Sequence, residues 1–289
     1  MLNILKMSLV FWILAYLFNM SFISCKKDES HIYYEELIDI YDILDRTEIG
    51  EQSIQGSAIY GNYLIQFFNR GYLAIIDLEN ETVIVTLLVP NTSSGYHANN
   101  VNFSNYWMDG NTDFPLLYVS ECYGSHRVFV YSLSFEGIAL IQTISFNGSG
   151  YESSNRYDWF LDNENNLIYT LGNTENHDTV ENNRILITGF ELPSPGEGDV
   201  ILSDEDVIDS FYNKDIYIYQ GSFVISSKVY CLFGIINPIG YTVIDLNTQK
   251  TSLIVNMESD FIDEPEGISR DNEGLVIVFY SGKVRRFKY

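Results

Sequence analysis

Residues 55–89 read QGSAIYGNYLIQFFNRGYLAIIDLENETVIVTLLV, and this segment carries the clearest structural pattern in the chain. It holds short segments rich in aliphatic and aromatic residues, separated by the turn-forming groups Gly61-Asn62, Arg70-Gly71 and Glu79-Asn80-Glu81. Segments of this composition favour strands, and short turns at regular spacing join antiparallel neighbours. We therefore predict one antiparallel sheet with four strands, at 55–59, 63–68, 72–78 and 82–89.

The same pattern recurs along the rest of the chain. The copies cover 55–89, 97–146, 157–211, 220–257 and 266–289. Gln220-Gly221-Ser222 repeats Gln55-Gly56-Ser57, and Ile244-Asp245-Leu246 repeats Ile76-Asp77-Leu78. The fourth strand of the third copy is placed only within 199–211. A supersecondary unit repeated at this spacing predicts a repeat architecture, in which each sheet packs against the next.

The two ends of the chain complete one another. The last copy supplies three strands and then the chain stops, while 36–44 near the N-terminus reads as a strand with no copy of its own. In β-propellers the first strand commonly closes the last sheet, which protects its edge. We therefore predict an all-β fold, a propeller of five four-stranded blades whose N-terminal strand closes the last blade. The alternatives are a two-sheet sandwich and a six-bladed ring with one degenerate blade.

The first 24 residues are typical of a secretory signal. Lys6 supplies a positive charge, residues 8–23 are almost wholly apolar, and Ser24 precedes Cys25. The apolar run is shorter than the roughly 20 residues that a membrane-spanning helix needs. We predict a signal peptide at 1–24, a tether at 25–34 and the propeller at 35–289.

The segment Phe22-Ile23-Ser24-Cys25 resembles the lipobox of bacterial lipoproteins, with Phe in place of the usual Leu at its first position. This resemblance implies cleavage before Cys25 and attachment of lipid to that residue. The charged segment Lys26-Lys27-Asp28-Glu29-Ser30 looks like the export signal of surface lipoproteins from Bacteroides-type bacteria. Together they imply an outer-membrane lipoprotein on the cell surface, with the periplasmic leaflet as the alternative.

The net charge limits the classes of binding partner, and the cysteine content predicts the state of the thiols. The chain carries 39 Asp and Glu against 16 Lys and Arg, a net charge of −23, which argues against binding nucleic acid. An acidic surface fits solubility outside the cell, with metal or glycan binding as the alternatives. Apart from Cys25, the cysteines are Cys122 and Cys231 in non-neighbouring copies, so we predict two buried free thiols.

Polar residues begin the first strand of each copy. Aligning the copies places at one register Gln55, His97, Tyr157, Gln220 and Glu266. First strands line the axis of a propeller, so these side chains are predicted to form a ring at the mouth of a channel. Convergent polar groups in a concavity are typical of a binding site. The alternative is structural: these side chains satisfy backbone groups at blade junctions or face channel water.

Further candidates extend this site. Asn99 and Asp158 lie beside the ring, Asp263 and Glu264 precede Glu266, and Trp107 lies in an insertion of the second copy. Aromatic faces beside amides and carboxylates suit sugar rings. No pattern predicts a metal site, a cofactor or a catalytic residue. The turns at 162–166 and 271–274 carry oxygen ligands but lack a full calcium-loop pattern.

Gln55-Gly56, Gln220-Gly221 and His97-x-Asn99 resemble the blade entrances of bacterial five-bladed β-propeller proteins, including receptor-binding and teichoic-acid-associated propellers. The resemblance implies the fold and the binding of a glycan or surface polymer. We expect a monomeric, lipid-anchored protein that binds a carbohydrate or cell-surface polymer. One alternative is a glycosidase or polysaccharide lyase that uses His97 or Tyr157 with Glu266 or Asp158. The other is a scaffold that docks an envelope protein.

Overall fold

The protein divides into two units, Met1–Ile32 and Tyr33–Tyr289, and the fold belongs to the second. The computed structural model describes residues 33–50, 52–90, 92, 97–121, 127–148, 157–173, 184–196, 198–216, 218–235, 238–257 and 263–288. The predicted signal peptide and Cys25 lie outside this set. Across the described ranges, no helix combines the length and the apolar character needed to cross a membrane.

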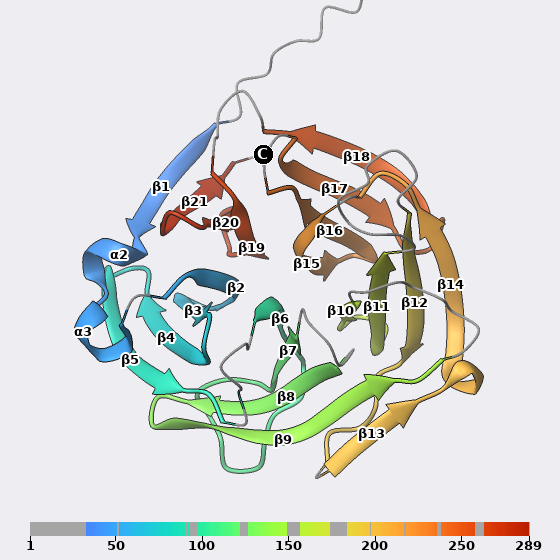
Figure 1. Cartoon of the computed structure of the whole chain (residues 1–289), viewed down its shortest axis with the longest axis horizontal. Coiled ribbons are helices and arrows are strands. Elements are labelled where there is room, and N and C mark those ends of the chain that lie inside the picture. Colours follow the sequence, from blue (N-terminus) through green and yellow to red (C-terminus); the bar gives the residue numbers. More distant parts are fainter. Residues whose placement is uncertain are drawn as a thin grey trace, which may run out of the picture. The chain divides into compact units, whose positions relative to one another are not determined.

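The second unit is a β-propeller of five blades arranged around one axis (Figure 1). Blade 1 contains β2 (Ile54–Tyr60), β3 (Tyr63–Phe68), β4 (Tyr72–Asp77) and β5 (Thr82–Leu88). Blade 2 contains β6 (Ala98–Phe103), β7 (Leu117–Glu121), β8 (Arg127–Ser134) and β9 (Gly137–Phe146). Blade 3 contains β10 (Tyr157–Asp162), β11 (Leu167–Asn173), β12 (Ile185–Glu191) and β14 (Val207–Asn213). Blade 4 contains β15 (Tyr219–Ile225), β16 (Lys228–Phe233), β17 (Gly240–Asp245) and β18 (Lys250–Asn256). The predicted fold class is confirmed.

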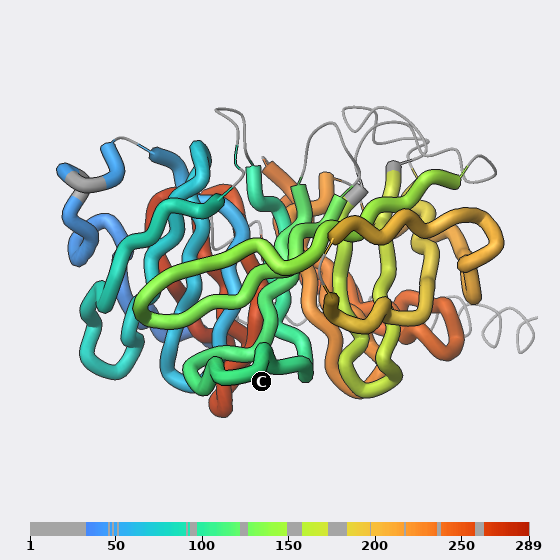
Figure 2. Tube along the Cα trace, turned by 90° about the horizontal axis from the view of Figure 1, so that it is seen from below, coloured from blue at the N-terminus to red at the C-terminus, as the bar shows by residue number. Residues whose placement is uncertain are grey.

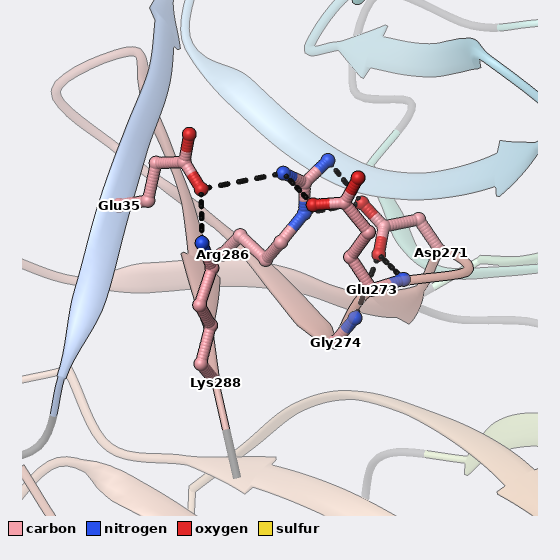
Figure 3. Close-up of polar contacts among 6 residues, drawn as sticks. All are labelled: Glu35, Asp271, Glu273, Gly274, Arg286 and Lys288. Atoms are coloured by element: carbon pink, nitrogen blue, oxygen red, sulfur yellow. Dashed lines mark hydrogen bonds and ion pairs between the residues drawn. The ribbon is translucent and has the colours of Figure 1, made fainter.

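Blade 5 joins the two ends of the unit. It contains β19 (Pro265–Arg270), β20 (Leu275–Phe279), β21 (Lys283–Phe287) and β1 (Tyr34–Asp39). β1 pairs antiparallel with β21, so the N-terminal strand closes the last blade as predicted. Across this pair Arg286 bonds Glu35 at 3.4 Å, and its guanidinium also bonds Asp271 at 2.6 Å and Glu273 at 2.9 Å in the turn between β19 and β20 (Figure 3). Lys288 also pairs with Glu35, so several ion pairs hold the closure.

The strand predicted at 36–44 ends earlier than expected. After Asp39 the chain enters the helical turn α2 (Ile40–Ile43), followed by α3 (Arg46–Ile49). The Asp39 side chain accepts a hydrogen bond from the backbone N–H of Tyr41 at 3.0 Å, which caps the turn. Ile40 and Leu44 are both buried at this turn.

The third copy gives one strand to its neighbour. β13 (Gly198–Leu202) pairs in parallel with β9 and forms a fifth strand of blade 2. The chain then passes through the short 3-10 helix Asp204–Asp206 and returns to blade 3 as β14. The interval 199–211, predicted to hold the fourth strand of this copy, therefore contains β13 and the start of β14, which belong to different blades.

The hydrophobic core lies between neighbouring blades. Successive residues of β3 point to opposite sides: Leu64 and Phe68 pack toward blade 5, whereas Ile65 and Phe67 pack toward blade 2. Burying each such side chain stabilises the fold by about 1.5–3 kcal/mol. Cys231 is a buried free thiol between blades 3 and 4, as predicted, while Cys122 lies outside the described residues.

Candidate functional site

The inner strands β2, β6, β15 and β19 each contain a bulge near their first residues. The bulges contain Gln55, Asn99, Gln220 and Glu266. An extra residue in a bulge re-aims its side chain, here at the same place in each blade. β10 pairs with β11 without a shift, and its second residue is Asp158.

The structural register corrects the sequence alignment in two copies. Asn99 and Asp158, not His97 and Tyr157, correspond to Gln55 in the neighbouring blades. His97 precedes β6 and is half-buried, and the side chain of Tyr157 lies outside the described residues. The ring therefore consists of Gln55, Asn99, Asp158, Gln220 and Glu266, all buried.

The inner strands approach one another closely at the axis. β6 contacts all the other inner strands, β2, β10, β15 and β19 (Figure 1). Glycine allows this approach, because a β-carbon on Gly56 would lie 2.8 Å from the carbonyl oxygen of Asn99.

One side of the axis is an asparagine cluster, which we define as Asn99, Asn100, Asn102, Ser120, Asp158 and Ser222. Asn99 donates to one oxygen of Asp158 at 2.7 Å, and Ser120 donates to the other at 3.1 Å. Asn100 donates to the Trp159 carbonyl at 2.7 Å and accepts from the Ser222 N–H at 2.9 Å. Buried polar groups that are paired in this way hold blades 2, 3 and 4 together. For Asn99 and Asp158 these contacts support the structural alternative.

The other side is an acidic half, which we define as Gln55, Ser57, Gln66, Gln220, Glu264 and Glu266. Glu266 is 5% exposed, and none of the groups that the structure describes donates a hydrogen bond to its carboxyl. Burial, together with the negative charges of Glu264 and Asp263, raises the pKa of Glu266 well above its ordinary value.

Glu264 reaches from this half toward solvent. It is half-buried and accepts a hydrogen bond from Gln220 Nε2 at 2.6 Å. Burial raises the pKa of Glu264, and the bond from Gln220 opposes that shift. Asp263, the next residue along, accepts from the N–H of Ser281 at 3.2 Å.

Blade 1 adds oxygen atoms without partners to the acidic half. Within the described ranges, Gln55 Oε1, Ser57 Oγ and Gln66 Oε1 are buried and form no hydrogen bond. Ser57 lies against Gly267, directly after Glu266. Gln66 lies between Leu64 and Phe68 on the same face of β3, so it faces blade 5. Each buried polar atom left unpaired costs about 1–3 kcal/mol, which a ligand that donates hydrogen bonds would offset.

Trp107 does not join this ring. It follows β6, whose residues span about 20 Å, so it lies at the opposite end of the inner strands. The loop at 104–116 runs along the lower edge of the unit in Figure 2. Trp107 is 45% exposed and contacts the edge of Tyr60, with ring centroids 6.0 Å apart. The predicted site residues thus divide between two ends of the propeller.

Open grooves also lie away from the ring. Two adjoining grooves between blades 1 and 5, at the end where the inner strands finish, share Gly61, Asp271 and Asn272. Their charged groups include Arg286, which Asp271 and Glu273 already neutralise (Figure 3). Shape alone favours these grooves. We place the candidate site in the acidic half, because its polar atoms lack partners there.

No family model matches this sequence, and no curated protein matches it. Among solved structures, the chain is similar to the glutaminyl cyclase of Myxococcus xanthus, with a TM-score of 0.54. The match covers 89% of this chain and 95% of that chain, at 10% sequence identity. This likeness shows the fold alone.

Sequence reasoning missed Ser57 and Gln66 as part of the site. Gln66 had a visible signal, because it is a lone amide within the apolar strand Leu64-Ile65-Gln66-Phe67-Phe68. An amide that is buried in a strand needs partners, and its oxygen has none among the described groups. Ser57 carried no such signal, because a serine that follows glycine also reads as an ordinary strand residue.

Proposed function

We propose that this protein is a lipid-anchored surface propeller that binds a carbohydrate or cell-surface polymer at the acidic half of its axis. The observation that carries the proposal is the carboxyl of the buried residue Glu266, which accepts no hydrogen bond from the described groups, together with the unpaired oxygens of Gln55, Ser57 and Gln66 in the adjacent blade 1. Folding that buries such acceptors is unfavourable unless donors satisfy them. Sugars present many hydroxyl donors, and they match a site composed of acceptors.

The location of the protein, lipid-anchored at the cell surface, is part of this proposal. Its support is the apolar N-terminal segment that ends at Cys25 and the charged residues that follow it. Expression with radiolabelled fatty acid tests it: label is expected in the native protein and not in Cys25→Ala. Protease treatment of whole cells then separates the outer surface, where the protein is cleaved, from the periplasmic leaflet, where it is protected.

Binding is tested by affinity electrophoresis of the detergent-solubilised full-length protein in gels that contain different polysaccharides. We expect one or more polymers to retard the protein, and Glu266→Gln to abolish the retardation. The matched control is Glu136→Gln, which makes the same change in the exposed turn between β8 and β9. Retardation that survives Glu266→Gln would place the site elsewhere, and retardation by no polymer would refute the proposal.

A glycan-active enzyme is the second candidate, and one observation favours it. Burial raises the pKa of Glu266, so its carboxyl retains its proton to higher pH than an ordinary glutamate, which is what a general acid needs. Asp158 is a poor partner for it, because both Asp158 oxygens accept hydrogen bonds within the asparagine cluster. An assay for new reducing ends tests this candidate, and a glutaminyl cyclase assay tests the activity named for the structural neighbour.

A further inference from the structure

We propose that the acidic half binds a primary ammonium group, and that the ligand is an amino sugar with a free amine rather than a neutral sugar. This inference rests on the proposed function, from which it takes the sugar. The ammonium group follows from the charge and hydrogen-bond inventory of the site.

The carboxylates of the site lack a counter-ion. Asp263, Glu264 and Glu266 lie within one short segment, and among the described side chains no Lys, Arg or His forms an ion pair with any of them. The closure of blade 5 shows the opposite arrangement, since Arg286 and Lys288 neutralise the carboxylates there. A ligand that brings one positive charge would supply what the acidic half lacks.

The hydrogen-bond inventory points to the same group. The carboxyl of Glu266 and the amide oxygens of Gln55 and Gln66 are acceptors, and they come from blades 5 and 1. An ammonium group has three donors and no acceptor, so it matches a site of acceptors on two sides. A sugar hydroxyl has one donor and no charge, so it would leave the negative charge of this segment without a counter-ion.

Gln220 fixes the second carboxylate of this arrangement. Its amide donates to Glu264 at 2.6 Å, which holds that carboxylate at the edge of the acidic half. Because Glu264 is half-buried whereas Glu266 is 5% exposed, the carboxyl groups extend from solvent toward the axis. A cation approaching from solvent therefore meets Glu264 first and Glu266 after it.

The test compares two soluble oligosaccharides that differ only at nitrogen, a glucosamine oligomer with free amines and its fully N-acetylated form. Titration calorimetry uses the full-length protein in detergent. We expect the free-amine oligomer to bind at least tenfold more tightly, and Glu266→Gln to remove that preference. Glu264→Gln is expected to reduce it severalfold, and Glu136→Gln to leave it unchanged. Circular dichroism confirms that each variant is folded.

Each other outcome has a distinct meaning. Equal binding of both oligomers, or Glu266-dependent binding of an uncharged polysaccharide instead, would overturn this inference and leave the proposed function standing. Binding of no saccharide by the folded protein would overturn both. Competition by a simple alkylamine or by calcium ions, at the concentration at which the glucosamine oligomer acts, would overturn the assignment to an amino sugar.

Discussion

The asparagine cluster and the acidic half lie at the same level of the propeller axis, and both consist of buried polar side chains. They differ in how those side chains are satisfied. Asn100 bonds groups from blades 3 and 4, whereas Glu266 receives no hydrogen bond from the described residues. Polarity at a propeller axis therefore serves two purposes, and the hydrogen-bond inventory distinguishes them. The paired groups hold blades together, and the unpaired groups of the acidic half are the ones to which our proposal assigns a ligand.

The largest loss of stability is expected when the hydrogen bonds of the asparagine cluster are removed. Asn100→Ala removes bonds to Trp159 and Ser222 and leaves their backbone groups buried without partners. We expect the free energy of unfolding to fall by about 3 kcal/mol or more, as measured by urea denaturation. The exposed Asn147→Ala is the control. A loss of less than about 1 kcal/mol would contradict the structural role of this side of the axis.

The acidic half predicts a pH dependence of stability. An unfolded glutamate loses its proton near pH 4.3, but folded Glu266 retains its proton to higher pH because its pKa is raised. Between these values the native state binds more protons, so stability falls as the pH rises, by up to about 1.4 kcal/mol per pH unit. Urea denaturation from pH 4.5 to 8 is expected to show this fall, and Glu266→Gln to reduce it.

The titratable groups around Glu266 determine which change in slope can be assigned to Glu266 alone. Glu264 and Asp263 are the titratable groups beside it, and both remain in Glu266→Gln. The ring residues on the strands packed against β19 are Gln55, Asn99 and Gln220, which do not titrate. Burial raises the pKa of Tyr219 on β15 and of Cys231 on β16, so both stay neutral over this range. A variant that keeps the native slope would show that Glu266 is ionised throughout.

A pair of identical substitutions sharpens the comparison further. Ser57→Ala removes a buried hydroxyl without a partner, and we expect it to raise the free energy of unfolding by about 0.5–1 kcal/mol. Ser120→Ala removes a hydroxyl that donates to Asp158, and we expect a loss of about 1–2 kcal/mol. Changes of the same sign in the two variants, measured by thermal and urea unfolding, would erase the distinction between the two sides.

The smallest effect is expected at the far end of the inner strands. Trp107→Ala removes a side chain that is 45% exposed and contacts Tyr60 at the edge. We expect stability to change by less than about 1 kcal/mol and the affinity of the polysaccharide ligand to stay within twofold. A large loss of affinity in electrophoresis would instead join the two ends into one extended site.

The sequence predicted the blades well because each is built from local hairpins. Turn residues such as Gly61-Asn62 and Arg70-Gly71 fix where strands end, and the composition between them fixes their type. The closure by β1 was also predictable, since counting strands left one copy short. These signals lie within short windows or depend only on the number of strands.

The rest depended on pairing between distant segments. The alignment chose His97, two residues before Asn99, and Tyr157, one residue before Asp158, because only the pairing of the strands fixes the register. β13 carries no local sign that it pairs with β9 of another copy. Whether Asp158 is satisfied and Glu266 is not depends on side chains brought together from different blades. Spacing in the sequence cannot supply that information.

The exchange of β13 bears on how this repeat array evolves. Genes for repeat proteins gain and lose whole copies, which is tolerated when each copy builds its own sheet and touches only its neighbours. Here the loss of the third copy would also strip the outer strand from blade 2 and expose β9, a long edge open to pairing between molecules. Because β13 completes blade 2, the second and third copies depend on each other structurally. A duplication or deletion of the third copy alone would therefore be unfavourable.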